Sequence, residues 1–472
     1  MNGPIRRVAI AAMAIFTALM LNITAGYLFR TDDLNNRAEN RRTGDARFAQ
    51  DRGPIMVGNS PIAKSEPVKD RYKFQRSYPS GKLYAPITGY YSYVFVASGL
   101  ERSFSDQLTG VDDSQFLDRL VNLLTGETPR GGTVETTIDA RAQRAAWYGL
   151  NGRKGAVVAI DTKTGAIRAL VSSPSYDPNQ LATHDLKDSQ KAWEKLTDDP
   201  DRPMANRATR EIYPPGSTFK LITAAAALES GIDPDTEIDA TAFDLPGSTV
   251  TISGRCGGDQ ITLTHALEVS CNPGFARLGA ELGADVLRAQ AERFGFGDTF
   301  VDEIGSAASL FPEEPDDAQT AMSAIGAFDV AASPLQMAMV AAAVANGGVV
   351  MEPYLVERVV SANLSVISQT LPRQHSTAVS ETVADQLHDM MVSVVEKGTG
   401  RRAQISGLTV GGKTGTAVPD ENRRPYAWFT AFADEVDLAV CVFIEDAQIP
   451  ATDIAGGTLA APIARAVIEA VR

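Results

Sequence analysis

The sequence of 472 residues predicts an α+β protein with one N-terminal membrane helix. Three observations carry this prediction. A predominantly apolar stretch over residues 8–29 is long enough to span a membrane. Two strand-like segments, 155–161 and 166–172, flank a Lys-Thr-Gly turn and predict a β-hairpin. Helical patterns then fill the middle of the chain before strands return near its end, and strands grouped apart from helices are typical of α+β folds.

The composition is that of an ordinary globular protein, and it excludes several classes. Hydrophobic residues make up 44% and charged residues 22% of the chain, which argues against disorder, collagen and a many-span transporter. A net charge of −14 lacks the basic footprint of a nucleic-acid-binding protein, so no nucleic acid is expected as a partner. Three cysteines and four histidines leave little for a disulfide-built scaffold or a metal site. We expect neither a metal nor a cofactor.

The apolar stretch is expected to anchor the protein in the cell membrane. Twenty-two helical residues (8–29) reach about 33 Å, against a hydrocarbon core of about 30 Å. A cleavable signal peptide has a shorter apolar part, and Ile23-Thr24-Ala25 is a poor cleavage site, so we favour an uncleaved anchor. Residues 1–7 would form a short cytoplasmic tail, and residues 30–472 would lie outside the cell. Arginines on both flanks weaken the positive-inside argument for this orientation.

Residues 30–150 are predicted to form an extended, non-catalytic stalk. They are polar, Arg-rich at the start and weakly patterned. Helical spacing predicts a helix over 114–124. Residues 133–138 alternate as a strand, after which Asp139 is placed to cap a helix.

The main domain is expected to occupy residues 151–472. The predicted hairpin opens it, and a long polar stretch over 173–213 follows, of a kind that often forms functional loops. An Ala-rich helix is predicted over 221–228. The remaining helical patterns cover 263–293, 334–346, 380–397 and 458–472, and the remaining strands cover 408–418, 426–433 and 437–444.

The sharpest chemical signal is the sequence Pro-Pro-Gly-Ser-Thr-Phe-Lys at 214–220, which opens the Ala-rich helix. A helix N-cap is a sufficient explanation for a serine at this position. A chemical role uses the same geometry, because Ser217 and Lys220 are three residues apart and share one face of a helix. A lysine made neutral by burial or nearby positive charge could take the proton of the serine hydroxyl. The free N–H groups of the helix start could hold an oxyanion.

Two weaker signals lie further along the chain. Ser270-Cys271-Asn272 reads either as the polar end of a helix or as a proton relay at Ser270 beside a substrate-binding amide at Asn272. Lys413-Thr-Gly-Thr416 begins a strand, which could present Lys413 and Thr416 to a carboxylate and pair its backbone with an extended peptide.

Three other patterns have simpler explanations. Residues 407–414 match the phosphate-loop pattern G-x-x-x-x-G-K-[ST], but Pro419 and a polar loop follow where that pattern needs a helix. Ser217 lacks the G-x-S-x-G context of Ser-His-Asp hydrolases, and no histidine lies in a recognisable motif. The Lys-Thr-Gly at 163–165 is accounted for by a hairpin turn. An NTPase and a Ser-His-Asp hydrolase are therefore minor alternatives.

Ser-x-x-Lys, Ser-x-Asn and Lys-Thr-Gly occur in this order, 53 and then 143 residues apart, as in penicillin-binding proteins and class A β-lactamases. The sequence resembles a class B penicillin-binding protein, a monofunctional peptidoglycan D,D-transpeptidase, and is most similar to the short actinobacterial PbpA type. The resemblance is strong over about 130–472 and looser over 30–130. It includes the segments 136–143, 156–161, 172–179, 206–208, 213–220, 333–338, 345–348, 398–400, 411–417 and 427–429. One departure is Ala327, which follows Ile325-Gly326 where the family usually has Gln.

The resemblance implies a fold and a reaction. The fold is a penicillin-binding/β-lactamase-like transpeptidase domain, with an antiparallel sheet between helices plus an all-helical lobe, behind a transmembrane helix and an extended pedestal. The donor is a peptidoglycan stem peptide ending in D-Ala-D-Ala, which acylates a serine with release of D-Ala. The amine of a neighbouring acceptor strand then resolves the acyl-enzyme. β-Lactams would acylate the same serine.

The resemblance also implies roles for individual residues. Carried over by motif, these are the nucleophile Ser217, its base Lys220, the proton relay Ser270, the substrate-binding Asn272, and the carboxylate-binding strand of Lys413, Thr414, Gly415 and Thr416. The backbone amides of Ser217 and Thr416 would form the oxyanion hole. Class B proteins commonly work with a polytopic glycan polymerase of the SEDS type, so such a partner is implied as well.

Several alternatives share the serine chemistry. A class A protein would need a glycosyltransferase domain that residues 30–150 are too few to supply, and a β-lactamase would be shorter and lack the stalk. A D,D-carboxypeptidase side activity stays open, because it depends on water access. A non-enzymatic sensor or scaffold that binds β-lactam or muropeptide is the alternative of a different class. The intact Lys220, Asn272 and Lys413 argue against it.

The cysteines allow one further prediction. Cys256 and Cys271 flank an apolar strand-to-helix stretch beside Ser270, and an extracytoplasmic compartment is oxidising. We expect a disulfide between them that rigidifies the edge of the site. Cys441 lies in an apolar strand and is expected to be a buried thiol.

Overall fold

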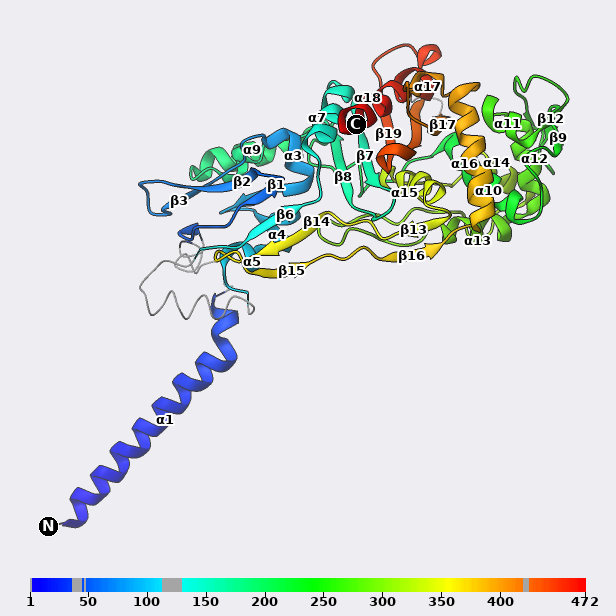
Figure 1. The fold of residues 1–472 in the computed structure, drawn as a ribbon. Helices are drawn as coiled ribbons and strands as arrows, with labels where there is room; N and C mark the ends of the chain where they lie inside the picture. The colour runs from blue at the N-terminus through cyan, green and yellow to red at the C-terminus, as the bar shows by residue number, and fades with distance from the viewer. Residues whose placement is uncertain (1, 36–44, 46–47, 113–129, 419–423) are drawn as a thin grey trace.

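The computed structural model describes the chain except for residues 1, 36–44, 46–47, 113–129 and 419–423. Figure 1 shows one helix, α1 (Asn2–Asn35), extending away from an elongated body formed by the rest of the described chain. Its segment Gly3–Tyr27 has a mean hydropathy of 2.1, is not buried, and is compatible with a single-pass membrane anchor. The helix predicted over 114–124 falls outside the described residues.

A six-stranded sheet, here called the pedestal sheet, lies at the end of the body nearest to α1 (Figure 1). In order across the sheet, its strands are β15 (Val366–Gln369), β14 (Val356–Val360), β6 (Thr133–Thr136), β1 (Ile55–Val57), β2 (Ser60–Pro67) and β3 (Phe74–Ser77). β6 runs parallel to β1 on one side and antiparallel to β14 on the other. The sheet therefore takes strands from both sides of the boundary predicted at 150/151.

A five-stranded antiparallel sheet, the central sheet, forms the core of the rest of the body. In order, its strands are β17 (Val410–Ala417), β18 (Tyr426–Ala433), β19 (Leu438–Asp446), β7 (Lys154–Asp161) and β8 (Ile167–Ser173). The predicted hairpin is β7–β8, and its partner β19 comes from near the other end of the chain. β18 is buried along its whole length, as expected for a strand covered on both faces. β17 is left as an edge strand.

Helices cover both faces of the central sheet. On one face, α7 (Ala140–Leu150) and α18 (Ala461–Val471) pack against alternate residues such as Val157 and Val440. On the other face, α15 (Pro334–Ala345) packs against the residues between them, such as Val158 and Cys441. Asp139 caps α7 as predicted, because its carboxylate accepts from the amides of Arg141 (2.7 Å) and Ala142 (3.3 Å).

A mainly helical lobe lies at the end of the body far from α1 and also holds a short strand pair, β9 (Glu237–Asp239) with β12 (Gln260–Thr262) (Figure 1). It contains α10 (Lys220–Glu229), α11 (Leu263–Val269), α12 (Asn272–Leu282), α13 (Ala284–Arg293), α14 (Asp317–Ala324) and α16 (Glu381–Glu396). The pattern over 263–293 is thus divided into three helices. Breaks fall at Ser270 and Gly283, which have φ angles of 59° and 84°. The predicted α+β class, with an antiparallel sheet between helices, is confirmed, whereas the lobe expected to be all-helical also contains short strand pairs.

The stretch over 173–213 is more regular than predicted. It contains a short helix, α8 (Asn179–Ala182), and a twelve-residue helix, α9 (Leu186–Thr197), whose cap is Asp185. Of the α9 residues only Ser189 is fully buried, while Ala192, Trp193 and Leu196 pack against a small cluster that includes Tyr90.

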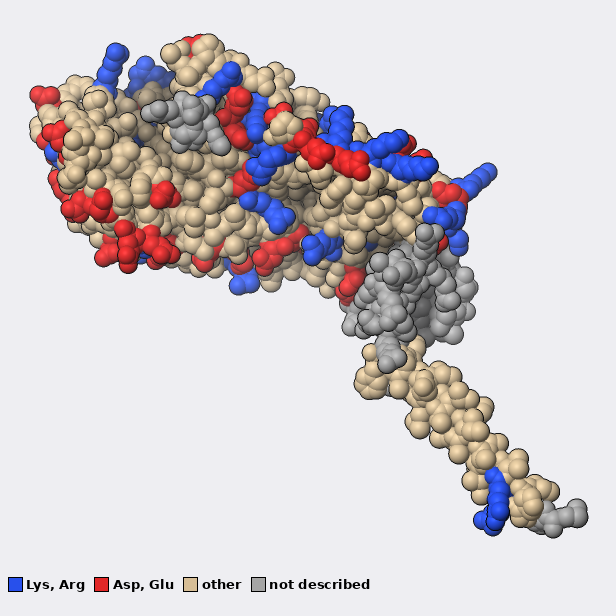
Figure 2. All heavy atoms as spheres, turned by 180° about the vertical axis from the view of Figure 1, so that it is seen from behind, with Lys and Arg blue, Asp and Glu red and all other residues tan. Residues whose placement is uncertain are grey.

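Shorter elements complete the fold. They are α3 (Gly81–Thr88), β4 (Tyr91–Ser92), β5 (Val96–Ala97), α4 (Gly99–Ser103), α5 (Ser105–Thr109), η2 (Gly216–Phe219), β9 (Glu237–Asp239), β10 (Phe243–Asp244), β11 (Thr251–Ile252), β12 (Gln260–Thr262), β13 (Val349–Met351), β16 (Gln374–Thr377), η3 (Arg401–Ala403), η4 (Asp434–Val436), η5 (Ala451–Asp453) and α17 (Gly456–Leu459). On the face shown in Figure 2, acidic side chains gather at the end of the body far from α1, and both signs of charge mix over the rest.

Candidate active site

Ser217 lies in a tight turn, η2, that leads into α10. Gly216 has a φ of +53°, a left-handed conformation that glycine adopts without steric cost. A Cβ at Gly216 would lie 2.7 Å from the carbonyl oxygen of Thr416, so the turn packs directly against β17. The Gly216 amide donates to the carbonyl of Gly326 at 3.0 Å, which brings the segment with the Ala327 departure against the same turn. These contacts fix Ser217 beside the edge strand.

Lys220 is completely buried at the start of α10. Its Nζ donates to the carbonyl oxygen of Ser270 at 2.8 Å, to Oδ1 of Asn272 at 2.6 Å and more weakly to Ser270 Oγ at 3.3 Å. Among the described residues, these bonds hold Lys220 toward the Ser270 segment and none joins it to Ser217 Oγ. Catalytic hydrogen bonds are often completed only when a substrate is bound.

Lys413 on β17 is the second fully buried lysine. Its Nζ donates to Ser270 Oγ at 2.9 Å and to the carbonyl of Thr414 at 3.0 Å. The Ser270 hydroxyl therefore lies between the ammonium groups of Lys220 and Lys413. Three motifs that are far apart in the sequence meet at this one hydroxyl.

Burial shifts the pKa of both lysines downward. Desolvation is the larger cause for Lys220, and the positive charge of Lys413 adds to it, so the pKa of Lys220 lies well below its usual range. Burial also lowers the pKa of Lys413 to about 7. Lys220 can consequently be neutral near neutral pH, which is the state that accepts a proton.

Ser270 has an unusual backbone conformation. It ends α11 with φ 59° and ψ 44°, a left-handed conformation that costs about 1–3 kcal/mol for a residue with a side chain. This conformation directs its carbonyl and its hydroxyl toward Lys220. The next residue, Cys271, begins α12 and forms a disulfide with Cys256, as the sequence predicts. Cys441 is a free, buried thiol whose pKa is raised by burial.

The strand β17 exposes its predicted carboxylate-binding residues unequally. Thr416 is exposed, whereas Thr414 is buried and its Oγ1 shares a hydrogen bond of 2.8 Å with Thr399 Oγ1. Sequence reasoning did not assign a role to Thr399, although its Gly-Thr-Gly motif carried part of the resemblance. The chain continues as a strand after Lys413, so residues 407–414 lack the helix that a phosphate loop requires.

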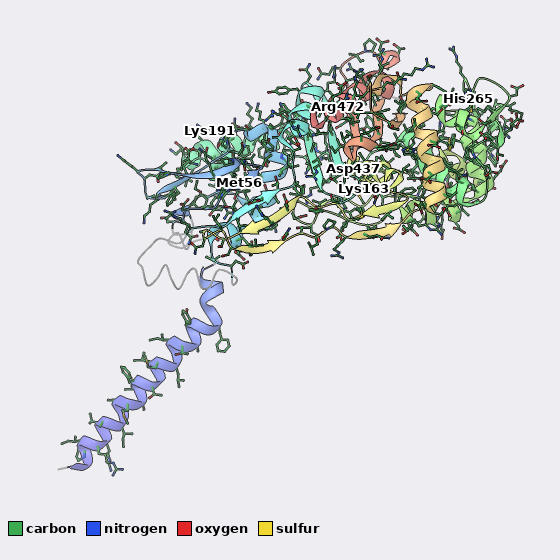
Figure 3. All side chains as sticks on the ribbon, viewed as in Figure 1. Met56, Lys163, Lys191, His265, Asp437 and Arg472 are labelled. Carbon is green, nitrogen blue, oxygen red and sulfur yellow. A yellow bond between two sulfur atoms is a disulfide. The ribbon has the colours of Figure 1, made fainter. Side chains whose placement is uncertain are left out.

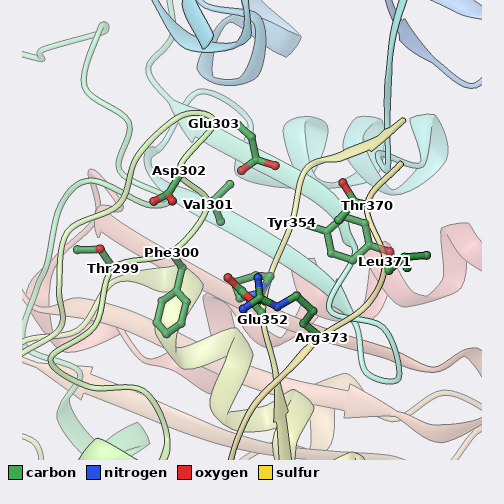
Figure 4. Close-up of a pocket in the computed structure, with 11 residues that line it drawn as sticks. Thr299, Phe300, Val301, Asp302, Glu303, Glu352, Tyr354, Thr370, Leu371 and Arg373 are labelled. Atoms are coloured by element: carbon green, nitrogen blue, oxygen red, sulfur yellow. Dashed lines mark ion pairs between the residues drawn. The ribbon is translucent and has the colours of Figure 1, made fainter. Parts of the chain in front are cut away.

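Other cavities are lined by different residues. A cavity of about 220 Å³ lies between the loop at 299–303 and the ion pair of Glu352 with Arg373 (Figure 4). A second cavity, of about 270 Å³, is lined by Lys163 and Asp437 among others. Lys163 lies in the turn between β7 and β8 and Asp437 lies directly before β19, and the two residues are close together (Figure 3). Neither cavity is lined by a predicted catalytic residue, and the Lys-Thr-Gly at 163–165 is not brought to Ser217. Within the described part of the chain, no group of His, Cys, Asp and Glu could hold a metal ion.

Comparison with known families now bears on this arrangement. Residues 155–469 match the family model of the penicillin-binding protein transpeptidase domain. The chain belongs to the penicillin-binding protein family. Residues 52–134 of this penicillin-binding protein also match a family described as the penicillin-binding protein A dimerisation domain.

Relatives and solved structures resemble this penicillin-binding protein over most of its length. The peptidoglycan D,D-transpeptidase PbpA of Mycolicibacterium smegmatis is 44% identical, with 100% of this chain and 99% of the relative covered. A structure of penicillin-binding protein A from M. tuberculosis, as a ceftriaxone acyl-enzyme complex, has 41% identity and a TM-score of 0.88. The imipenem acyl-enzyme complex has 42% identity and a TM-score of 0.86. Each structure covers 90% of this chain and 99% of its own. The predicted PbpA-type class and transpeptidase fold are confirmed.

Proposed function

We propose that this penicillin-binding protein is a serine-type peptidoglycan D,D-transpeptidase that cross-links stem peptides and is a target of β-lactams. One observation carries the proposal. The hydroxyl of Ser270 lies between two buried lysines, beside the turn that holds Ser217. The names of the relatives and the acyl-enzyme complexes of similar structures support it.

Acylation begins with the attack of Ser217 Oγ on the carbonyl carbon between the two D-alanines. Neutral Lys220 accepts the hydroxyl proton and becomes an ammonium group. Its nitrogen lies 3.3 Å from Ser270 Oγ, to which it can pass a proton. Ser270 passes a proton to the nitrogen of the departing D-Ala, and the C–N bond breaks. The amides of Ser217 and Thr416 hold the oxyanion, which stabilises the tetrahedral intermediate. Attack by an acceptor amine reverses these proton transfers and completes the cross-link.

Lys413 accounts for the selection of a donor that ends in a carboxylate. Its buried ammonium group contacts a hydroxyl and a carbonyl oxygen in the described structure, and a substrate carboxylate beside it would supply the missing negative charge. Thr416, exposed on the same strand, would bind the same carboxylate. The Thr414 hydroxyl can accept its hydrogen bond from Thr399 and would then donate its own proton to that carboxylate. Asn272 holds Lys220 in the free protein and would bind the peptide carbonyl of the donor.

The reaction can be tested with the purified full-length protein, a stem peptide ending in D-Ala-D-Ala and an acceptor amine. We expect covalent labelling by fluorescent penicillin, release of D-Ala and formation of a cross-linked peptide. Release of D-Ala without the cross-linked product would identify a carboxypeptidase instead. Labelling without any peptide turnover would favour the sensor alternative and overturn the proposal.

The proposed substrate also favours a topology and a partner. Since peptidoglycan lies outside the membrane, we infer that residues 1–7 are cytoplasmic, that 8–29 span the membrane, and that 30–150 and 151–472 are an extracytoplasmic pedestal and transpeptidase domain. Protease added outside spheroplasts should then digest the body.

We further infer a polytopic glycan polymerase of the SEDS type as a partner of the span and pedestal. Its loss from the purified complex on replacement of 8–29 by an unrelated span would support this partner.

The disulfide beside Ser270 leads to a further prediction. Replacing Cys256 and Cys271 together by serine should slow acylation by fluorescent penicillin about 10-fold, because Ser270 loses a fixed neighbour. The bridge spans 15 residues, so its loss should also lower the free energy of unfolding by about 3 kcal/mol. Thermal unfolding and labelling rates measure the two effects. Cys441→Ala is the matched control for acylation, and a double variant that is labelled at the unmodified rate would contradict the prediction.

A further inference from the structure

Glu268 links α11 to α16, the helix that packs against β17, although no catalytic motif includes it. It lies on α11, two residues before Ser270, and its side chain is only 11% exposed. One carboxylate oxygen accepts a hydrogen bond from the hydroxyl of Ser393 on α16. The other contacts Nδ1 of His265 at 2.8 Å. The side chain therefore fastens the end of α11 to α16.

The backbone of Glu268 reaches the segment that follows α16. Its carbonyl accepts a hydrogen bond from the amide of Thr399 at 3.0 Å. A Cβ at Gly398 would overlap that carbonyl, so the approach depends on glycine at this position. The hydroxyl of Thr399 in turn bonds the hydroxyl of Thr414 on β17 at 2.8 Å.

Together these contacts close a ring between Ser270 and β17. From Ser270, one path runs through Lys413 Nζ (2.9 Å) to β17, and the other runs through the backbone carbonyl of Glu268 and through Thr399 to the same strand at Thr414. The separation of Ser270 from β17 is thus fixed from two sides. Because Ser270 has a left-handed backbone conformation, surrounding contacts have to hold it in place.

We propose that Glu268 is a positioning residue for acylation, which holds the Ser270 hydroxyl at its place between Lys220 and Lys413. The inference rests on the proposed function, and Glu268 acts through Ser270 because no bond joins it to either lysine among the described residues. Misplacing a catalytic group by about 1 Å can cost roughly 100-fold in rate. Loosening this contact should therefore slow the chemistry in a protein that remains folded.

The test is the second-order rate constant of acylation by fluorescent penicillin, measured from pH 6 to pH 9 on the full-length protein. Glu268→Ala should lower it by about 10- to 100-fold. Glu268→Gln should stay within about 3-fold, because its amide oxygen can still accept the hydrogen bond from Ser393. The midpoint of the acidic limb should be unchanged in both variants, since the burial of Lys220 and the charge of Lys413, which lower the pKa of Lys220, remain.

Glu229 supplies a matched control at the other end of α16. Its carboxylate accepts from the amide of Ser380 at 2.7 Å, far along the helix from Ser393, so Glu229→Ala should be acylated at the unmodified rate. If Glu268→Ala does not fold, Ser393→Ala removes one bond and should slow acylation about 3- to 10-fold.

Three results would overturn the inference. They are an unmodified rate in folded Glu268→Ala, an equal loss in Glu229→Ala, or a shifted acidic limb in Glu268→Gln, which would indicate an electrostatic role. Failure of the proposed function would look different, because the unmodified protein itself would then not be labelled.

Discussion

Ser217→Ala should abolish covalent labelling by fluorescent penicillin and the release of D-Ala from a donor peptide. The variant loses the only atom that forms the acyl bond, so a loss on the order of 10⁴-fold or more is expected. The turn around it depends on Gly216 and its contact with β17 rather than on the serine hydroxyl. The free energy of unfolding should therefore change by less than about 1 kcal/mol.

Mass spectrometry after incubation with penicillin measures the covalent adduct, and thermal unfolding checks that the variant is folded. Ser270→Ala is a useful comparison, because it removes the hydroxyl between the lysines and leaves the nucleophile in place. It should be labelled slowly but completely. An adduct on Ser217→Ala would show that another residue is the nucleophile.

Lys220→Met should lower the acylation rate by about 10²- to 10⁴-fold, the usual contribution of a general base. Methionine has a side chain of similar length for this fully buried position but cannot accept a proton, and it removes the bonds to Ser270 and Asn272. Stopped-flow or time-resolved labelling measures the rate. Labelling of Lys220→Met at the unmodified rate would assign the base elsewhere.

The same lysine predicts the pH dependence of the unmodified protein. Burial and the charge of Lys413 lower the pKa of Lys220, so its neutral form accumulates as pH rises through that lowered value. The acylation rate should rise as pH rises through the lowered pKa of Lys220, and it should be low below that pH, where Lys220 carries a proton. A rate profile of Lys220→Met with the same acidic limb would contradict this assignment.

The same two lysines affect stability. An unfolded chain keeps its lysines protonated to higher pH, so this pair makes folding more favourable as pH rises toward the ordinary lysine pKa.

Local signals in the sequence were sufficient for much of the central sheet. The hairpin of β7 and β8, the cap at Asp139 and the late strands are encoded by residues within a few positions of each other. The helix α9 was missed because polar residues outnumber the apolar ones that recur along it at helical spacing. The entry of β14 into the pedestal sheet depends on pairing with β6, more than 200 residues away, which no local pattern reports.

In the candidate active site too, the sequence predicts which residues take part but not how they are arranged in space. Motif order predicts catalytic roles for Ser217, Lys220, Ser270 and Lys413, but spacings of 53 and 143 residues say nothing of distances in space. The position of the Ser270 hydroxyl between two lysines follows from tertiary packing and a left-handed backbone. The contacts of Lys220 with Asn272, and of Thr414 with Thr399, were likewise beyond sequence reasoning because they join separate elements.

The strand exchange between the two sheets limits how this protein can be recombined with its relatives. The segment with β14 and β15 leaves the catalytic part, completes the pedestal sheet and returns, so the chain crosses between the two parts more than once. A chimera joined at one point near residue 150 would combine β6 from one parent with β14 from the other. Successful exchange of pedestals would require two further junctions, one on each side of 356–369. Inheritance of the pedestal as a unit therefore involves two separate stretches of the gene.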